Sequence, residues 1–202
     1  MKPATCRDEF TEELAQCRSL REYAIDHIEK DEVRFLTLES AQSRAFRAYE
    51  NFIENVFLSF MTGEPSVSGA AVGRYVTPPS REHARRMLQG KARFLDWADP
   101  STVIERGEYY FYPDGHLSVA VTQSWNMIDW MRKIRDHIAH NSVESAAQYR
   151  KVVAALLLIE PPVAPRPGEL LQMRPRRGPF KGREVLASLF SDLEAFVAAA
   201  VG

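Results

Sequence analysis

The chain has 202 residues, of which 45% are hydrophobic and 26% charged, a composition that suits a globular domain and excludes a disordered or fibrous chain. Its 26 Lys and Arg residues nearly balance its 27 Asp and Glu residues, so any nucleic-acid site must be local. The longest apolar runs, 152–159 and 196–201, are far shorter than the roughly 20 residues of a membrane span, and we expect no membrane partner.

The cellular location is predicted from the first residues and from the cysteines. Residues 1–10 mix several charges without an apolar stretch, so we expect no secretory signal. Cys6 and Cys17 would lie about three turns apart on one helix, which is too far for a disulfide. Two free thiols fit a reducing compartment. We therefore expect a cytoplasmic protein in which both cysteines are packing residues.

Two amphipathic helices are predicted in the first third of the chain. From Thr11 to Lys30, apolar residues recur at steps of three and four. A stronger helix is predicted from about Ser40 to Met61, and Gly63 and Pro65 end it. Its apolar stripe consists of Ala45, Tyr49, Phe52, Val56 and Phe60, broadened by Phe46, Ile53 and Phe57.

An insertion is predicted from about residue 63 to residue 121. Its first part is rich in Gly, Ser and Pro, which favours an exposed connection. Ser80 is a suitable cap for a helix from Arg81 to about Trp97. The segment from Glu108 to Val121 is typical of a β-hairpin, with Pro113-Asp114-Gly115 as its turn.

Three further helices complete the predicted fold. One runs from about Thr122 to His140, the next follows a cap at Ser142, and the last runs from Arg183 to Val201. A proline-rich loop from Pro161 to Gly182 precedes the last helix. The sequence thus predicts a mainly α protein, an up-and-down bundle of four to five long helices with a small β-hairpin insertion. We expect residues 1–202 to form a single domain.

The densest cluster of titratable groups lies at the predicted end of the third long helix, in residues 135–142. Asp136 and His140 are four residues apart and share a helix face, so the carboxylate can orient the imidazole. Arg135 offers a permanent charge and a fork of donors that matches phosphate oxygens. On an ideal helix Arg135 and His140 lie about 140° apart. Either the helix ends there, at Asn141, or a second subunit completes the site.

Other interpretations of this cluster exist. Arg135 and His140 can be a surface arginine and a helix-terminal histidine favoured by the helix dipole. His137, His140 and Glu144 would align on one face of a continuous helix and suit a metal. Because Asn141 and Ser142 are expected to break that helix, we predict no metal site and no cofactor. The same arginine-to-histidine spacing also occurs from Arg132 to His137.

The motif from Arg135 to His140 resembles that of the HEPN family, helical bundles in which an Arg is followed, after four to six residues, by a His. The family usually has a polar residue after the Arg, as Asp136 is here. The helix with Tyr49-Glu50-Asn51 is similar to the earlier HEPN helix that packs beside the motif and often carries an acidic residue, here Glu50. The resemblance covers about half of the chain and leaves residues 63–121 unmatched.

The resemblance implies a function. Many HEPN proteins are metal-independent endoribonucleases, toxins or antiviral effectors whose groove forms between two protomers. Arg135, His140 and Asp136 would then be catalytic, with Glu50, Asn141 and His137 in support, RNA as substrate and a homodimer as the active state. An antitoxin or regulatory protein would be a further partner. Ser142 stands where one antitoxin-controlled subgroup has a modified Tyr, which argues against that mode of control.

The proline-rich loop and the start of the last helix carry a local excess of positive charge. We expect this segment to contact RNA phosphates, although a solvated loop would have the same composition. The alternative to a nuclease is a non-catalytic HEPN-like module that binds RNA, a nucleotide or a partner protein. The expected RNA-contacting residues are Arg174, Arg176, Arg177, Lys181 and Arg183.

Overall fold

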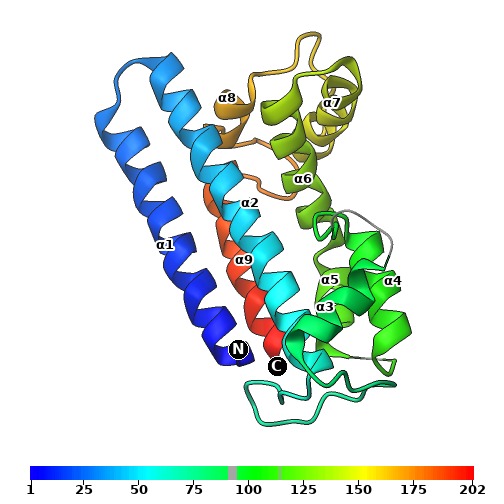
Figure 1. Ribbon diagram of the computed structural model, residues 1–202. Helices are drawn as coiled ribbons and strands as arrows, with labels where there is room; N and C mark the ends of the chain where they lie inside the picture. Colours follow the sequence, from blue (N-terminus) through cyan, green and yellow to red (C-terminus); the bar gives the residue numbers. More distant parts are fainter. Residues whose placement is uncertain (91–94, 114) are drawn as a thin grey trace. The chain divides into compact units, whose positions relative to one another are not determined.

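The computed structural model describes residues 1–90, 95–113 and 115–202. Within these ranges the chain forms nine helices and no β-strand, so the predicted mainly α class is confirmed (Figure 1). None of these helices is both long enough and apolar enough to cross a membrane. The helices are α1 Pro3–His27, α2 Asp31–Met61, α3 Arg81–Gln89, α4 Pro100–Tyr110, α5 His116–Gln123, α6 Trp125–His140, α7 Val143–Leu157, α8 Pro167–Gln172 and α9 Val185–Val201.

The chain divides into two compact units. The first unit comprises Met1–Glu12, Ala48–Ile128 and Leu193–Gly202, and the second comprises Glu13–Arg47 and Asp129–Asp192. Helices α1, α2, α6 and α9 each contribute residues to both units. All candidate site residues except Glu50 belong to the second unit.

Aromatic side chains fill the core of the first unit. Phe57 of α2 lies 4.8 Å from Phe111 and 5.3 Å from Trp97 between ring centroids. One helical turn and a half earlier, Phe52 lies 5.6 Å from Phe10 of α1. Burial of such rings is the main favourable term in folding. The apolar stripe predicted for the second long helix is confirmed, because all eight of its residues are buried.

The predicted β-hairpin is wrong. Helix α4 continues to Tyr110 and α5 begins at His116, so most of the segment from 108 to 121 is helical. The described residues contain only one isolated antiparallel bridge, between Arg74 and Phe111. The centre of the predicted turn, Asp114, lies outside the described residues.

Local helix signals explain why this segment is helical. The side chain of Asp99 accepts a hydrogen bond from the backbone N–H of Ser101 at 3.2 Å, and Pro100 occupies the first turn of α4. A capping carboxylate followed by Pro is a strong helix start. The aromatic run around Tyr110 imitates a strand, but the helix started at Asp99 includes it.

The helix predicted from Arg81 to about Trp97 is shorter than expected. Its cap is confirmed, because the Ser80 hydroxyl accepts a hydrogen bond from the backbone N–H of His83 at 3.1 Å. Helix α3 ends at Gln89, and Gly90 follows in the left-handed conformation with φ of 52°. Such a glycine is a common helix end. Residues 91–94 lie outside the described ranges.

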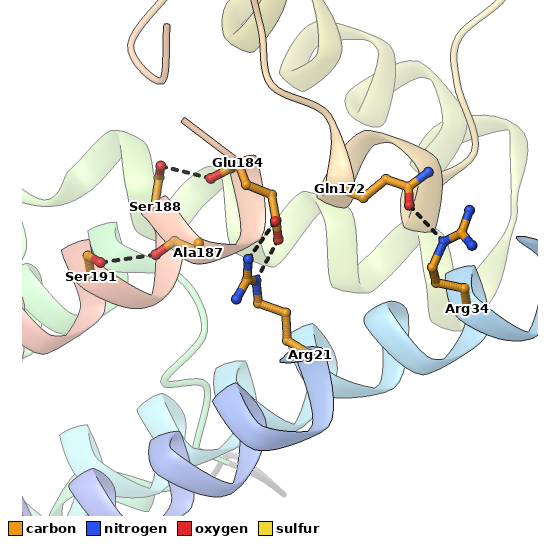
Figure 2. Close-up of polar contacts among 7 residues, drawn as sticks. All are labelled: Arg21, Arg34, Gln172, Glu184, Ala187, Ser188 and Ser191. Atoms are coloured by element: carbon orange, nitrogen blue, oxygen red, sulfur yellow. Dashed lines mark hydrogen bonds and ion pairs between the residues drawn. The ribbon is translucent and has the colours of Figure 1, made fainter. Parts of the chain in front are cut away.

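A buried ion pair organises the second unit. The guanidinium of Arg21 on α1 donates two hydrogen bonds to the carboxylate of Glu184, at 2.6 and 2.5 Å (Figure 2). The Arg21 side chain is 18% exposed and that of Glu184 only 5%. The bond from Glu184 raises the pKa of Arg21. This pair joins α1 to the residue directly before α9.

A second arginine joins α2 to α8 in the same unit. Arg34 Nε donates to the side-chain oxygen of Gln172 at 3.0 Å (Figure 2), and its Nη1 donates to the Ile28 carbonyl at 3.0 Å. Arg34 also pairs with Asp31. Helix α8 lies within the segment predicted as an irregular loop from Pro161 to Gly182, where Pro167 in its first turn favours a helix start.

Both cysteines are buried and unpaired, as predicted. Burial raises the pKa of Cys6 and raises that of Cys17 to about 11. Because the thiolate is the reactive form, we expect neither thiol to react with a disulfide reagent in the native protein between pH 7 and 9. Both should react at once in denaturant. Rapid stoichiometric labelling of the native protein would contradict this packing role.

Candidate functional site

The α6–α7 turn ends the motif helix where the sequence predicts. Helix α6 stops at His140, and Asn141 follows in the left-handed conformation with φ of 44°. The Ser142 hydroxyl then accepts from the backbone N–H of Ser145, and the Ser145 hydroxyl accepts from that of Ser142. This capping box starts α7 at Val143. The predicted helix stop at Asn141 and cap at Ser142 are confirmed.

Interactions within the second unit hold α6 in place. Gln42 is fully buried on α2, and its amide donates to the Met131 carbonyl at 2.9 Å. Met131 and Ile134 are also fully buried. On the other side of α6, Trp130 makes an edge-to-face contact with Phe180, with 6.0 Å between ring centroids. The end of α6 is therefore presented from a packed helix rather than from a loop.

His140 lies in a pocket of about 580 Å³ at this turn. The imidazole is exposed, and Asp136, one turn earlier on α6, lines the same pocket, as their spacing predicted. Helix α7 contributes Gln148 and Glu144, and hydrogen bonds from the Glu144 backbone N–H and from Ser142 lower the pKa of Glu144. We call this the His140 pocket. It combines an imidazole, carboxylates and two basic groups.

The basic groups that line the His140 pocket are Arg132 and Lys133. Both bind the same carboxylate, because Asp129 accepts from Arg132 Nη2 at 2.9 Å and from Lys133 Nζ at 2.6 Å. All three side chains are at most 30% exposed. Two cations held by one anion leave a net positive charge at the pocket. Such a charge suits a phosphate group.

Arg135 is placed differently from His140. Its guanidinium carbon lies 5.2 Å from the centroid of the Phe46 ring on α2, and its Nη1 lies 3.0 Å from Asp136 Oδ1. Arg135 does not line the described part of the His140 pocket. Asp136 is the residue that the two share, since it binds Arg135 and faces the pocket of His140. The separation expected from the helical period is therefore present.

His137 faces a second pocket on the opposite side of the turn. Its ring stacks on Tyr149 with 4.7 Å between centroids and 19° between planes. Its Nδ1 lies 3.3 Å from the Ser145 hydroxyl. Burial lowers the pKa of His137, and the nearby Glu39 carboxylate partly opposes this effect. A neutral imidazole is therefore favoured at this position.

The lowered pKa of His137 predicts a pH dependence of stability. The unfolded chain binds this proton more readily, so protonation favours unfolding, and the contribution is complete above the unfolded pKa of about 6.5. We expect the free energy of unfolding to fall as pH decreases below that value. His137→Phe should weaken this dependence between pH 7 and 5. Identical pH profiles for the variant and the native protein would contradict the assignment.

The remaining candidate residues lie apart from the His140 pocket. Glu50 belongs to the first unit and the motif to the second. Asn141 lines the pocket of His137. The five predicted RNA-contacting residues, Arg174, Arg176, Arg177, Lys181 and Arg183, are all exposed. Arg183 also packs over Phe180, with 5.6 Å from its guanidinium carbon to the ring centroid.

The loop that carries these basic residues is folded against the second unit. Phe180 and Pro175 are buried, and the backbone N–H of Gly182 donates to the Pro175 carbonyl at 2.8 Å. Gly178 has φ of 89°, and a Cβ there would lie 2.3 Å from the Leu156 carbonyl oxygen. Only glycine fits such a close approach. The basic side chains are thus displayed on a fixed loop.

A metal site of three or more His, Cys, Asp or Glu side chains does not occur in the part of the chain that the structure describes. The alternative set His137, His140 and Glu144 is accordingly not brought together. The two histidines face different pockets, and Glu144 follows the break at Asn141.

Two features of the site were not found from the sequence. Arg132 was noted only for its spacing to His137, although it lines the pocket of His140. Glu39 carried no motif, and its place beside His137 depends on the packing of α2 in the second unit. Neither contact leaves a local signal in the sequence. Comparisons of the chain with protein families, with curated proteins and with solved structures find no match.

Proposed function

We propose that this chain is a metal-independent endoribonuclease of HEPN type that cleaves RNA through attack by the 2′-hydroxyl. The observation that carries the proposal is the His140 pocket, where an exposed imidazole, the Asp136 carboxylate and two cationic side chains meet at a helix end. These groups match the needs of phosphodiester cleavage: a proton carrier and a positive charge beside the phosphate. The setting that we propose is toxin–antitoxin or phage defence.

In the proposed reaction, the 2′-oxygen forms a bond to the neighbouring phosphorus, and the bond from phosphorus to the 5′-oxygen of the next nucleotide breaks. The 2′-hydroxyl loses its proton, and the leaving 5′-oxygen gains one. His140 would exchange protons in this step, because imidazole titrates near neutral pH. The products are a 2′,3′-cyclic phosphate and a 5′-hydroxyl, and no oxidant or metal enters the balance.

Positive charge near the phosphate would come from three side chains. Arg132 and Lys133 line the His140 pocket, and Arg135 is connected to it through Asp136. We propose that Arg135 reaches the reacting phosphate in a homodimer, where a second copy of the chain completes the groove. The exposed basic residues of the loop 174–183 would hold the RNA backbone farther away.

A non-catalytic binding module is the second candidate. It is favoured by the placement of Arg135, which packs over Phe46 and pairs with Asp136 rather than lining the His140 pocket. In that case the same surface would bind RNA, a nucleotide or a partner protein without cleaving it.

The two candidates are separated by incubating the purified native protein with RNA and with DNA of the same sequence, each in excess EDTA. A metal-independent enzyme that needs the 2′-hydroxyl cuts the RNA and leaves the DNA intact. Binding of RNA without cleavage would support the module. Cleavage of both polymers would contradict the proposed chemistry.

A further inference from the structure

The second pocket at the α6–α7 turn has the features of a built binding site. It encloses about 470 Å³, within the range of small-molecule sites. Its polar lining comes from Glu39, His137, Asn141, Arg150 and Arg166, and its apolar walls from Tyr149 and the proline-rich segment 162–167. We call it the Glu39 pocket. The proposed nuclease chemistry uses none of its polar groups directly.

Hydrogen bonds fix the proline-rich wall of the Glu39 pocket. Tyr149 donates its hydroxyl proton to the Pro165 carbonyl at 3.0 Å, and the backbone N–H of Gly168 donates to Glu39 Oε1 at 2.9 Å. A Cβ at Gly168 would lie 2.5 Å from the Phe35 backbone, so the wall sits directly on α2. The pocket is therefore largely preformed, which lowers the entropy cost of binding.

The Glu39 carboxylate sets the hydrogen-bond pattern of the pocket. An ionised carboxylate accepts about four hydrogen bonds, and the Gly168 amide uses one. Guanine presents two adjacent donors, N1–H and the N2 amino group, on its pairing edge, whereas adenine presents an acceptor at N1. Arginine is the common donor to guanine O6 and N7, and Arg150 and Arg166 both line the pocket.

The Glu39 pocket adjoins the His140 pocket. Asn141 lines the former, and Ser142, the next residue, lines the latter. Ser145 lines the His140 pocket and contacts the imidazole of His137, which lines the Glu39 pocket. A nucleotide with its phosphate beside His140 would therefore have its base within reach of Glu39. The stacked rings of His137 and Tyr149 give that base a flat wall.

We propose that the Glu39 pocket binds a guanine base, and, resting on the proposed nuclease function, that this guanine flanks the cleaved phosphate of the RNA. Glu39 would accept from N1–H and the N2 amino group. Arg150, Arg166 and the Asn141 amide would donate to the opposite edge. The pocket would thus set the sequence preference of the enzyme.

The test uses GMP and AMP as probes of the full-length protein by titration calorimetry, with Glu39→Gln and Glu32→Gln as variants. Glu39→Gln keeps an oxygen that can accept the Gly168 amide but replaces the other acceptor with a donor. Glu32 is exposed on the same helix and lines neither pocket. We expect native protein and Glu32→Gln to bind GMP at least roughly tenfold more tightly than AMP, and Glu39→Gln to lose this preference.

Equal binding of GMP and AMP by the native protein, or an unchanged preference in Glu39→Gln, would overturn the proposal. Cleavage of RNA distinguishes the two proposals and the source of the base. If RNA is cut next to guanosine and Glu39→Gln removes the preference, both stand. If GMP binding depends on Glu39 but RNA is not cut, the pocket is a free guanine-nucleotide site and the nuclease proposal fails. If RNA is cut without any preference and GMP does not bind, only the guanine site fails.

Discussion

His140→Ala is expected to lower the rate of RNA cleavage by roughly 10²–10⁴-fold, the usual contribution of a positioned general acid or base. The imidazole is exposed at the last residue of α6 and lines the pocket that contains Asp136, Arg132 and Lys133. No other histidine lines the described part of that pocket, so no second imidazole replaces it within the protomer. The rate is measured on a fluorescent RNA oligonucleotide in EDTA, with enzyme in excess.

The control for this prediction is His83→Ala. His83 is exposed on α3 and lies in the first unit, away from the α6–α7 turn. Both variants should unfold at the same temperature as the native protein, because neither imidazole is buried. Full activity of His140→Ala, or an equal loss in His83→Ala, would refute the role of His140 in proton transfer.

Arg21→Ala is expected to lower the free energy of unfolding by about 3–5 kcal/mol, the typical cost of leaving one partner of a buried ion pair without its counter-charge. The Glu184 side chain is only 5% exposed, and Arg21 supplies both of its closest donors. The variant therefore leaves a carboxylate in the interior, at the start of α9. Urea denaturation followed by circular dichroism measures the change.

Arg44→Ala is the matched control for Arg21→Ala. Arg44 also binds a carboxylate of α1, Glu13, with Nε 2.9 Å from Oε2, but both side chains are about 45% exposed. Solvent screens such a pair, so we expect a much smaller change in stability. Replacing both Arg21 and Glu184 with apolar residues should recover most of the loss. A single Arg21→Ala variant as stable as Arg44→Ala would show that the pair contributes little.

The helices could be predicted from the sequence because their signals are local. The eight apolar residues of α2 recur at helical spacing and are all buried, and the stop at Asn141 follows from residues within one turn of it. The predicted hairpin failed where two local signals competed. The aromatic run at 109–112 favoured a strand, whereas Asp99 and Pro100 started a helix ten residues earlier that includes part of the run.

The candidate site could be predicted only in part. The shared face of Asp136 and His140 and the separation of Arg135 from His140 follow from the helical period, and the structure has both. The partners from distant segments could not be inferred. Phe46 beneath Arg135, and Glu39 beside His137, lie about 90 to 100 residues away in sequence, and packing alone brings them to α6. Patterns within one helix carry no information on such contacts.

The chemical ends of the RNA products test the central proposal most directly. The native protein is incubated in excess EDTA with a synthetic RNA, and the fragments are weighed by mass spectrometry. Attack by the 2′-hydroxyl predicts a 2′,3′-cyclic phosphate on one fragment and a 5′-hydroxyl on the other. A single 2′-deoxy substitution at the cleaved nucleotide should stop cleavage there. Fragments with a 3′-hydroxyl and a 5′-phosphate, or cleavage of the substituted RNA at the same position, would contradict the mechanism.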